Sequence, residues 1–104
     1  MRKRYIYMSI PFDSVPEIAY YIWLTDHGVK FTYHPNIRLT YYDKKNAKHY
    51  YEPDFLIKES NRLEEIKSHY IMSITSAEKI QCMADNNVQV IYDEIYKKYI
   101  EYCV

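Results

Sequence analysis

The sequence predicts one α/β domain, residues 1–104, in which helices flank a mixed central β-sheet. Three observations indicate this fold class. Residues 15–27 carry apolar side chains at helical spacing, residues 29–68 contain short alternating runs, and residues 88–92 form a compact β-branched run. A chain of 104 residues can bury only one modest core, so we expect a single sheet with a few helices. The predicted order is α-β-β-β-β-α-β-α.

The first helix is expected over residues 15–27. Ser14 and Glu17 have the S-x-x-E spacing of a capping box, with a proline in the first turn. Apolar residues then recur at the i, i+3, i+4 and i+7 positions of one face. Gly28, the only glycine in the chain, should end the helix. Residues 4–9 form a short extended lead-in that stops before the next proline.

Strand patterns fill the middle of the chain. Each run either alternates apolar and polar residues or is continuously apolar, and turn-forming residues separate the runs. The third run is the most apolar, and the turn at Glu59–Arg62 joins it to the fourth as a hairpin. The four strands are expected at Val29–His34, Ile37–Tyr42, Tyr50–Lys58 and Leu63–Ser68.

A helix, a buried strand and a last helix are expected after the hairpin. Thr75 and Glu78 have the spacing of a second capping box, which would open a helix that runs to about Asn86. The segment Val88–Tyr92 is β-branched and apolar, as expected of a buried strand. Asp93 should then cap the last helix.

Composition narrows the class of protein. The formal net charge is zero, whereas nucleic-acid-binding proteins are usually basic, although residues 1–4 and 43–48 are locally basic. Cys82 and Cys103 form no CxxC pair, and the four histidines lack zinc-ligand spacing. We therefore expect a reduced, cytoplasmic protein. No stretch is long and apolar enough to span a bilayer, so no membrane partner is expected.

Fourteen tyrosines are an unusual number for a chain of this length. Tyrosine joins a large apolar ring to a polar hydroxyl, so it suits shallow cores and interfaces, including a dimer contact. The pairs Tyr41-Tyr42 and Tyr50-Tyr51 should each send one ring to each face of the sheet. Base stacking by exposed tyrosines is the alternative use.

Three charged residues, Asp54, Glu65 and Lys67, lie in the predicted hairpin. A half-buried carboxylate is costly unless something offsets its charge. If the turn is centred between Ser60 and Asn61, Asp54 lies opposite Lys67 and diagonal to Glu65 on one face. The other face then carries Phe55, Ile57 and Ile66, which should enter the core.

Two interpretations of this patch are open. Close carboxylates repel each other unless one is protonated or a cation lies between them, and oxygen ligands favour Mg²⁺ or Mn²⁺. The alternative is an exposed cross-strand ion pair between Asp54 and Lys67, which contributes at most about 1 kcal/mol. That pair alone favours the second interpretation. Glu65 in the same patch, the Pro-Asp dipeptide and the upstream helix favour the metal site.

The residues Pro53-Asp54 and Glu65-Ile66-Lys67, joined by a short hairpin, resemble the motif of the PD-(D/E)xK nuclease superfamily. The order of a helix, three strands, a helix and a strand resembles the core of that family over nearly the whole chain. The stretches PEIAYYIWL, FTYHP, YEPDF and EIK are most similar to small transposon-associated endonuclease subunits and very-short-patch-repair-like proteins. The resemblance implies a restriction-endonuclease-like core.

The resemblance also implies roles for individual residues. Asp54 and Glu65 would bind Mg²⁺ or Mn²⁺ together with the backbone carbonyl of Ile66, and Lys67 would position or activate the attacking water. Glu17 matches the helical acidic residue that assists the metal, although it could instead only cap its own helix, a contribution of about 1 kcal/mol or less. Weaker DNA contacts, each with an ordinary surface position as the alternative, are expected from Lys79, Gln81, His69, Lys44 and Lys45.

We therefore expect a Mg²⁺-dependent DNA endonuclease of a phage, a mobile element, or a repair or restriction system. The sequence offers no separate DNA-recognition domain, so DNA contact would need the basic loops, a homodimer or a DNA-targeting partner protein. Two other classes stay open. One is a nucleic-acid-binding module that kept the fold and lost the chemistry, and the other is an assembly protein whose tyrosines form an interface.

Overall fold

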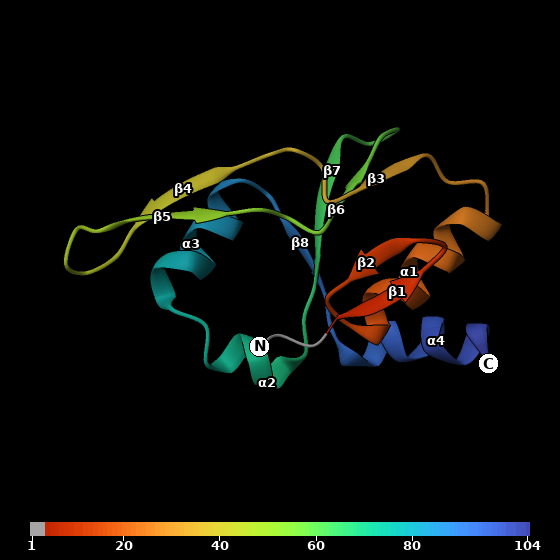
Figure 1. Cartoon of the computed structure of the whole chain (residues 1–104). Helices are drawn as coiled ribbons and strands as arrows, with labels where there is room; N and C mark the ends of the chain where they lie inside the picture. Colours follow the sequence, from red (N-terminus) through yellow and green to blue (C-terminus); the bar gives the residue numbers. More distant parts are fainter. Residues whose placement is uncertain (1–3) are drawn as a thin grey trace.

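The computed structural model describes residues 4–104 and has a mixed α/β fold, as the sequence predicts (Figure 1). The basic segment at residues 1–4 lies outside the described residues except for Arg4. Twelve elements follow one another along the described residues. They are β1 (Tyr5–Tyr7), β2 (Ile10–Phe12), α1 (Val15–Asp26), β3 (Phe31–Tyr33), β4 (Leu39–Tyr42), β5 (Lys48–Tyr51), β6 (Phe55–Ile57), β7 (Arg62–Ile66), α2 (His69–Ser73), α3 (Ala77–Asp85), β8 (Gln89–Ile91) and α4 (Asp93–Cys103).

The central sheet has four strands in the order β3-β6-β7-β8. β3, β6 and β7 are antiparallel neighbours, whereas β7 and β8 are parallel, so the sheet is mixed. A parallel pair needs a crossover connection, which α2 and α3 provide here. Figure 1 shows α1 and α4 side by side next to the sheet, while α3 lies under β4 and β5 at the other end of the molecule.

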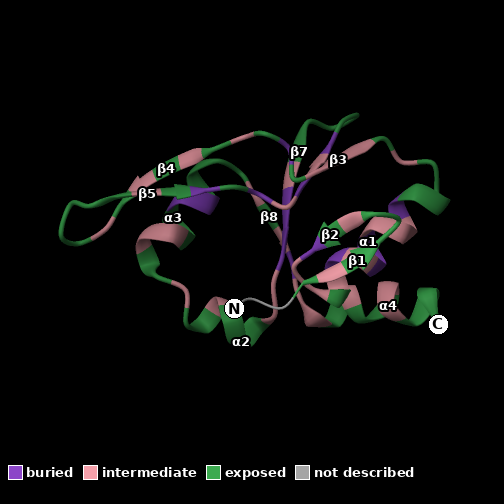
Figure 2. Ribbon diagram, in the orientation of Figure 1, coloured by how far each residue is buried: buried purple, intermediate pink, exposed green. Residues whose placement is uncertain are grey.

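Two apolar clusters cover opposite faces of the sheet. The first joins α1, α4 and the sheet face that carries Phe55, Ile57 and Ile66, all three of which are buried as predicted (Figure 2). The second lies under the β4–β5 hairpin, where Tyr51 packs with Cys82 and Met83 of α3. The two faces differ because successive strand residues point to opposite sides.

The start of the chain differs from the prediction. Ile10–Phe12, where a proline was expected to stop the extended segment, pairs with Tyr5–Tyr7 as the antiparallel hairpin β1–β2. Met8 and Ser9 form the tight turn with φ of 51° and 65°, a left-handed conformation that no glycine marks in the sequence. Proline is tolerated because this strand has only one neighbour.

The expectation of one sheet and an unbroken strand at Tyr50–Lys58 is wrong. The segment divides into β5, which pairs only with β4, and β6, which enters the central sheet. Pro53 lies at the break. Because proline has no N–H to donate to a strand ladder, it interrupts the strand pairing at this position. The break carries the chain from the hairpin into the sheet, with Asp54 immediately before β6.

The helix ends show both agreement and correction. α1 begins as predicted, with Ser14 Oγ accepting a hydrogen bond from the Glu17 N–H at 3.4 Å. α3 is capped by Ser76 rather than Thr75. Asp93 is the first residue of α4 and not its cap, because Tyr92 occupies the cap position. The short helix α2 was not predicted, and it begins after Ser68, whose side chain accepts from the Ile71 N–H.

In the part of the chain that the structure describes, every helix is too short or too polar to cross a bilayer.

Candidate active site

The β6–β7 hairpin determines where the motif carboxylates lie. Phe55 pairs with Glu64, so continuing the register by one residue brings Asp54 opposite Glu65 rather than opposite Lys67. The turn is centred one residue earlier than expected, and the Asn61 N–H donates to the Lys58 carbonyl at 3.3 Å. The predicted pairing is therefore wrong by two positions. A shift of two keeps every side chain on its expected face, so the acidic patch survives.

Asp54 and Glu65 contact each other's strands directly. Asp54 Oδ2 accepts a hydrogen bond from the Ile66 N–H at 2.9 Å, and the Asp54 N–H donates to Glu65 Oε1 at 3.2 Å. Pro53 is buried immediately before Asp54, and Ile66 is buried in the core beside Glu65. The two carboxylates are thus held by backbone groups and by packed neighbours, which fixes their position.

Lys67 and Tyr51 complete the contacts of Glu65. Lys67 Nζ lies 3.5 Å from Glu65 Oε2, and its side chain is 16% exposed. The Tyr51 hydroxyl donates to Glu65 Oε1 at 2.8 Å. Because burial raises the pKa of the Tyr51 hydroxyl, it remains a donor. The interpretation of Asp54 and Lys67 as a simple exposed ion pair does not fit, since the ammonium pairs with a buried Glu65 instead.

Glu17 reaches the same region from the first turn of α1. Its Oε1 accepts from the Ser14 hydroxyl at 3.1 Å, and its Oε2 accepts from the Tyr33 hydroxyl at 2.7 Å. Glu17 thus contacts its cap residue and also lines the pocket described below, so its position is compatible with both the helix-cap and the site interpretation.

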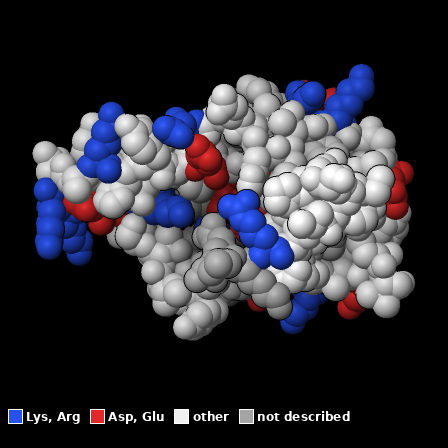
Figure 3. Space-filling model, in the orientation of Figure 1, with Lys and Arg blue, Asp and Glu red and all other residues white. Residues whose placement is uncertain are grey.

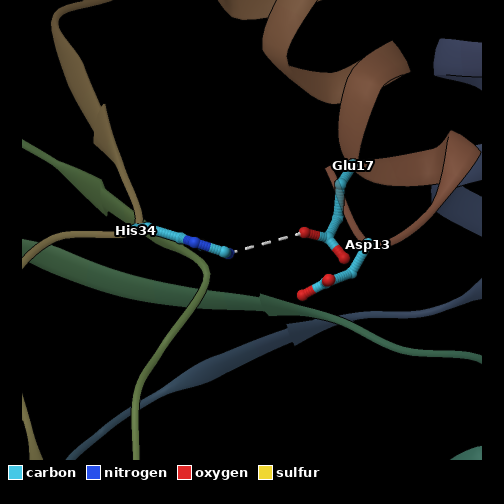
Figure 4. Close-up of side chains that lie close together, drawn as sticks. All are labelled: Asp13, Glu17 and His34. Carbon is cyan, nitrogen blue, oxygen red and sulfur yellow. Dashed lines mark ion pairs between the residues drawn. The ribbon is translucent and has the colours of Figure 1, made fainter. Parts of the chain in front are cut away.

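A histidine, His34, and a second acid, Asp13, lie close to Glu17. His34 Nε2 lies 3.9 Å from Glu17 Oε2, and Figure 4 shows the His34 ring pointing toward the carboxylates of Glu17 and Asp13. These three residues each offer a ligand atom within 4.8 Å of the others. The backbone N–H of His34 also donates to the backbone carbonyl of Asp54 at 2.8 Å, so this group of three residues is attached to the segment that carries Asp54.

One open pocket of about 490 Å³ collects these side chains. Of the residues that the sequence predicted for the site, it brings together Glu17, Asp54, Glu65, Lys67 and the metal-ligand candidate Ile66, and it adds Lys79 from α3. Five acidic side chains line it, and the lining residues that carry charge are Asp13, Glu17, Glu52, Asp54, Glu65, Lys67 and Lys79.

Burial and neighbouring charges in this pocket shift the pKa values of Asp54, Glu17 and Lys79. Burial raises the pKa of Asp54 well above its ordinary value, and the charges of Glu65 and Glu17 raise it further against the smaller effects of the Ile66 N–H and Lys67. Burial also raises the pKa of Glu17. Burial and the nearby Lys67 charge lower the pKa of Lys79. The protein's own groups thus leave the carboxylates of this pocket incompletely neutralised.

Four of the weaker DNA-contact candidates lie elsewhere. Gln81 donates to Asp85 within α3, and His69 stacks on Tyr92 with its Nε2 2.9 Å from Glu94. Lys44 and Lys45 are exposed in the β4–β5 loop. Gln81 and His69 are therefore engaged with neighbours outside the pocket, while the two loop lysines stay available at the surface.

Sequence reasoning missed Tyr51, Tyr33, Asp13 and His34, which the fold places around the predicted acids. Tyr51 and Tyr33 hold Glu65 and Glu17, and Asp13 and His34 lie close to Glu17. Both tyrosines belong to the stretches FTYHP and YEPDF, which could have indicated them. Tyr51 is the last residue of β5 and lies on its buried side. Because successive strand residues alternate between the two faces, this side could have been inferred once β5 was known to end before Pro53.

The side chains of this pocket have the chemistry that a hard divalent cation prefers. Asp54, Glu65 and Glu17 supply carboxylate oxygens, the ligands that Mg²⁺ and Mn²⁺ prefer. Among the described residues, however, the groups of three whose ligand atoms all lie within 4.8 Å of one another are Asp13-Glu17-His34 and His69-Asp93-Glu94, and not Asp54-Glu65-Glu17. Burial is the main cause of the raised pKa of Asp54, and the negative charges of Glu65 and Glu17 add to it. No family model, curated protein or solved structure matches this chain, so the assignment depends on the residues themselves.

Proposed function

We propose that this protein is a Mg²⁺- or Mn²⁺-dependent DNA endonuclease with a restriction-endonuclease-like core. One observation supports the proposal above the others: Glu17, Asp54, Glu65 and Lys67 come from α1, the β5–β6 break, β7 and the residue after β7, yet all line one pocket. This combination of acids and one lysine is the set expected from the PD-(D/E)xK resemblance.

The residues would divide the work as follows. Asp54, Glu65 and the carbonyl of Ile66 would hold the ion, with Glu17 assisting from α1. When bound, the ion lowers the pKa of a coordinated water and offsets charge on the phosphate. Lys67, already beside Glu65, would hold the attacking water and donate hydrogen bonds to a phosphate oxygen. Tyr51 and the Ile66 N–H keep the two strand carboxylates in place.

The proposed reaction is hydrolysis of the DNA backbone. Water attacks phosphorus in line with the bond to the 3′-oxygen, and that bond breaks. The products carry a 5′-phosphate and a 3′-hydroxyl. A homodimer or a DNA-targeting partner protein would add further contacts to the DNA.

A cleavage assay tests this function. The purified protein is incubated with supercoiled, linear, single-stranded and four-way-junction DNA in Mg²⁺ or Mn²⁺, with EDTA as the control. We expect cleavage of at least one form in metal and none in EDTA. Asp54→Ala and Lys67→Ala should each abolish it while leaving the circular dichroism spectrum unchanged.

Matched controls lie in the same hairpin. Glu59 and Lys58 are exposed in the β6–β7 turn, so Glu59→Ala and Lys58→Ala change the same kinds of charge without touching the pocket. These variants should cut as well as the wild type. If Asp54→Ala also cut at the wild-type rate, the site assignment would be wrong. Intact metal binding without cleavage of any form would favour a non-catalytic binding module.

A further inference from the structure

The β4–β5 hairpin forms a separate arm beside the pocket. Its two strands pair only with each other, and Figure 1 shows the hairpin extending sideways from the central sheet, with its loop at the far end. The register pairs Leu39 with Tyr51 and Thr40 with Tyr50. This register assigns each residue of the arm to one of two faces.

One face of the arm is packed and the other is exposed. Tyr41 and Tyr51 turn toward α3, where Tyr51 is buried against Cys82 and Met83. Tyr42 and Tyr50 point the other way and are 53% and 56% exposed. The predicted division of each tyrosine pair between the faces is therefore confirmed. Packing on α3 explains the inner rings but leaves the outer two without a role in the core.

Cations accompany the outer tyrosines. The guanidinium carbon of Arg38 lies 4.8 Å from the ring centre of Tyr50, and Lys48 Nζ lies 5.5 Å from it. Lys44 and Lys45 are exposed in the loop at the tip. Figure 3 shows basic side chains gathered at this end of the molecule. Exposed aromatic rings therefore alternate with positive charge along one face of the arm.

The acids of the arm offset only part of this charge, since the arm carries two acids, Asp43 and Glu52, but four basic residues, Arg38, Lys44, Lys45 and Lys48. Asp43 is turned into the loop, where it accepts hydrogen bonds from the N–H groups of Lys45 and Ala47 and lies 2.8 Å from His49 Nε2. Glu52 pairs with Arg38 at 3.2 Å. The ammonium groups of the three arm lysines have no such partner on the arm, so the face is positive overall.

The exposed face leads to the proposed active site. Tyr50 lies on this face and also lines the pocket that holds Asp54 and Glu65. Tyr50 therefore lies where the outer face of the arm meets the lining of the pocket.

We infer that the outer face of the β4–β5 arm binds an unpaired stretch of a DNA strand and delivers it to the pocket. The inference rests on the proposed nuclease function and names its substrate class: DNA with single-stranded character next to the cut. Lysines would contact the phosphates, and tyrosine rings would stack on bases. Base faces are open to stacking only where the bases are unpaired, which is why the arm selects a single strand over a duplex.

Fluorescence anisotropy in EDTA measures this binding without cleavage. The probes are a labelled oligothymidylate of about 15 nucleotides and a duplex of the same length. We expect the wild type to prefer the single strand at low salt. Tyr42→Ala and Tyr50→Ala should each weaken single-strand binding by about 5-fold or more, as loss of one stacked base predicts. The corresponding phenylalanine variants keep the ring and should bind like the wild type.

Charge reversal tests the phosphate contacts. The double variant Lys44→Glu/Lys45→Glu should weaken single-strand binding, whereas Lys97→Glu/Lys98→Glu, with the same charge change on exposed positions of α4, should not. Equal losses in both double variants would overturn the inference. Unchanged binding in the tyrosine variants, or equal affinity for duplex and single strand, would also overturn it.

The inference about the arm and the proposal of a nuclease site can be refuted separately. Asp54→Ala should keep arm-dependent binding even though it cannot cut. If the arm variants bind normally while the wild type cuts DNA in Mg²⁺, only the arm inference is wrong. If Asp54→Ala cuts normally, the nuclease proposal is wrong whatever the binding data show.

Discussion

Replacing Tyr51 with phenylalanine removes one hydroxyl from the candidate active site and nothing else. That hydroxyl donates to Glu65 Oε1 at 2.8 Å, and the two residues are only 4% and 5% exposed. Without it, the same oxygen keeps only the 3.2 Å hydrogen bond from the Asp54 N–H. Water cannot readily replace the lost donor at so buried a position, so the loss should be measurable.

The expected magnitude follows from the type of bond. A hydrogen bond to a charged group contributes about 1.5–3 kcal/mol to stability. For a domain of this size, each kcal/mol changes the melting temperature by about 4–8 °C, so Tyr51→Phe should melt roughly 6–24 °C lower. Residues that orient a metal ligand also affect metal affinity, so Mn²⁺ binding should weaken by about 10- to 100-fold.

Thermal denaturation and calorimetric titration with Mn²⁺ measure these two effects. Tyr41→Phe is the matched control, because Tyr41 lies on the same face of the arm and its ring stacks on His49 at 5.1 Å. The control should change neither quantity appreciably. Wild-type stability and wild-type Mn²⁺ affinity in Tyr51→Phe would refute the argument that this hydroxyl positions Glu65.

Three further predictions concern stability. Burial and the charges of Glu65 and Glu17 raise the folded-state pKa of Asp54 above its unfolded value of about 3.9. In EDTA, the wild type should therefore lose stability as the pH rises from the unfolded pKa through the folded pKa. Asp54→Asn should melt higher than the wild type at pH 7, and this difference should vanish in acid. Phe55→Ala removes a ring that is 0% exposed and should cost about 3–5 kcal/mol in urea denaturation, with a cost below about 1 kcal/mol contradicting its place in the core. Gly28→Ala should cost about 1–2 kcal/mol in the same assay, because φ is +68° and a Cβ there meets nothing within 4 Å, so backbone strain is the only penalty.

The sequence predicted the faces of the strand residues better than it predicted the pairing of the strands. Strand alternation depends only on the side-chain period, so the faces of Asp54, Glu65 and Phe55 came out correctly even though the turn was placed one residue too late. Local chemistry also sufficed for α1, where a serine cap and the glycine after the helix mark both ends.

The remaining differences come from long-range pairing and from turns without glycine. The sequence did not show that Pro53 divides the run Tyr50–Lys58 between two sheets, because the run also reads as one continuous strand. The turn at Met8 and Ser9 uses residues that seldom adopt positive φ, so no local signal marked the β1–β2 hairpin. The contacts of Tyr33 and Tyr51 to the acids join residues 16 and 14 positions apart and depend on the assembled fold.

The most direct test is the position of a bound ion. A crystal of the wild type soaked in Mn²⁺ gives an anomalous difference map in which manganese is located without assumptions about the site. We predict a peak in the pocket, in contact with Asp54 and Glu65. A peak only at the exposed group formed by His69, Asp93 and Glu94, or no peak in the pocket at a concentration that supports cleavage, would contradict the account.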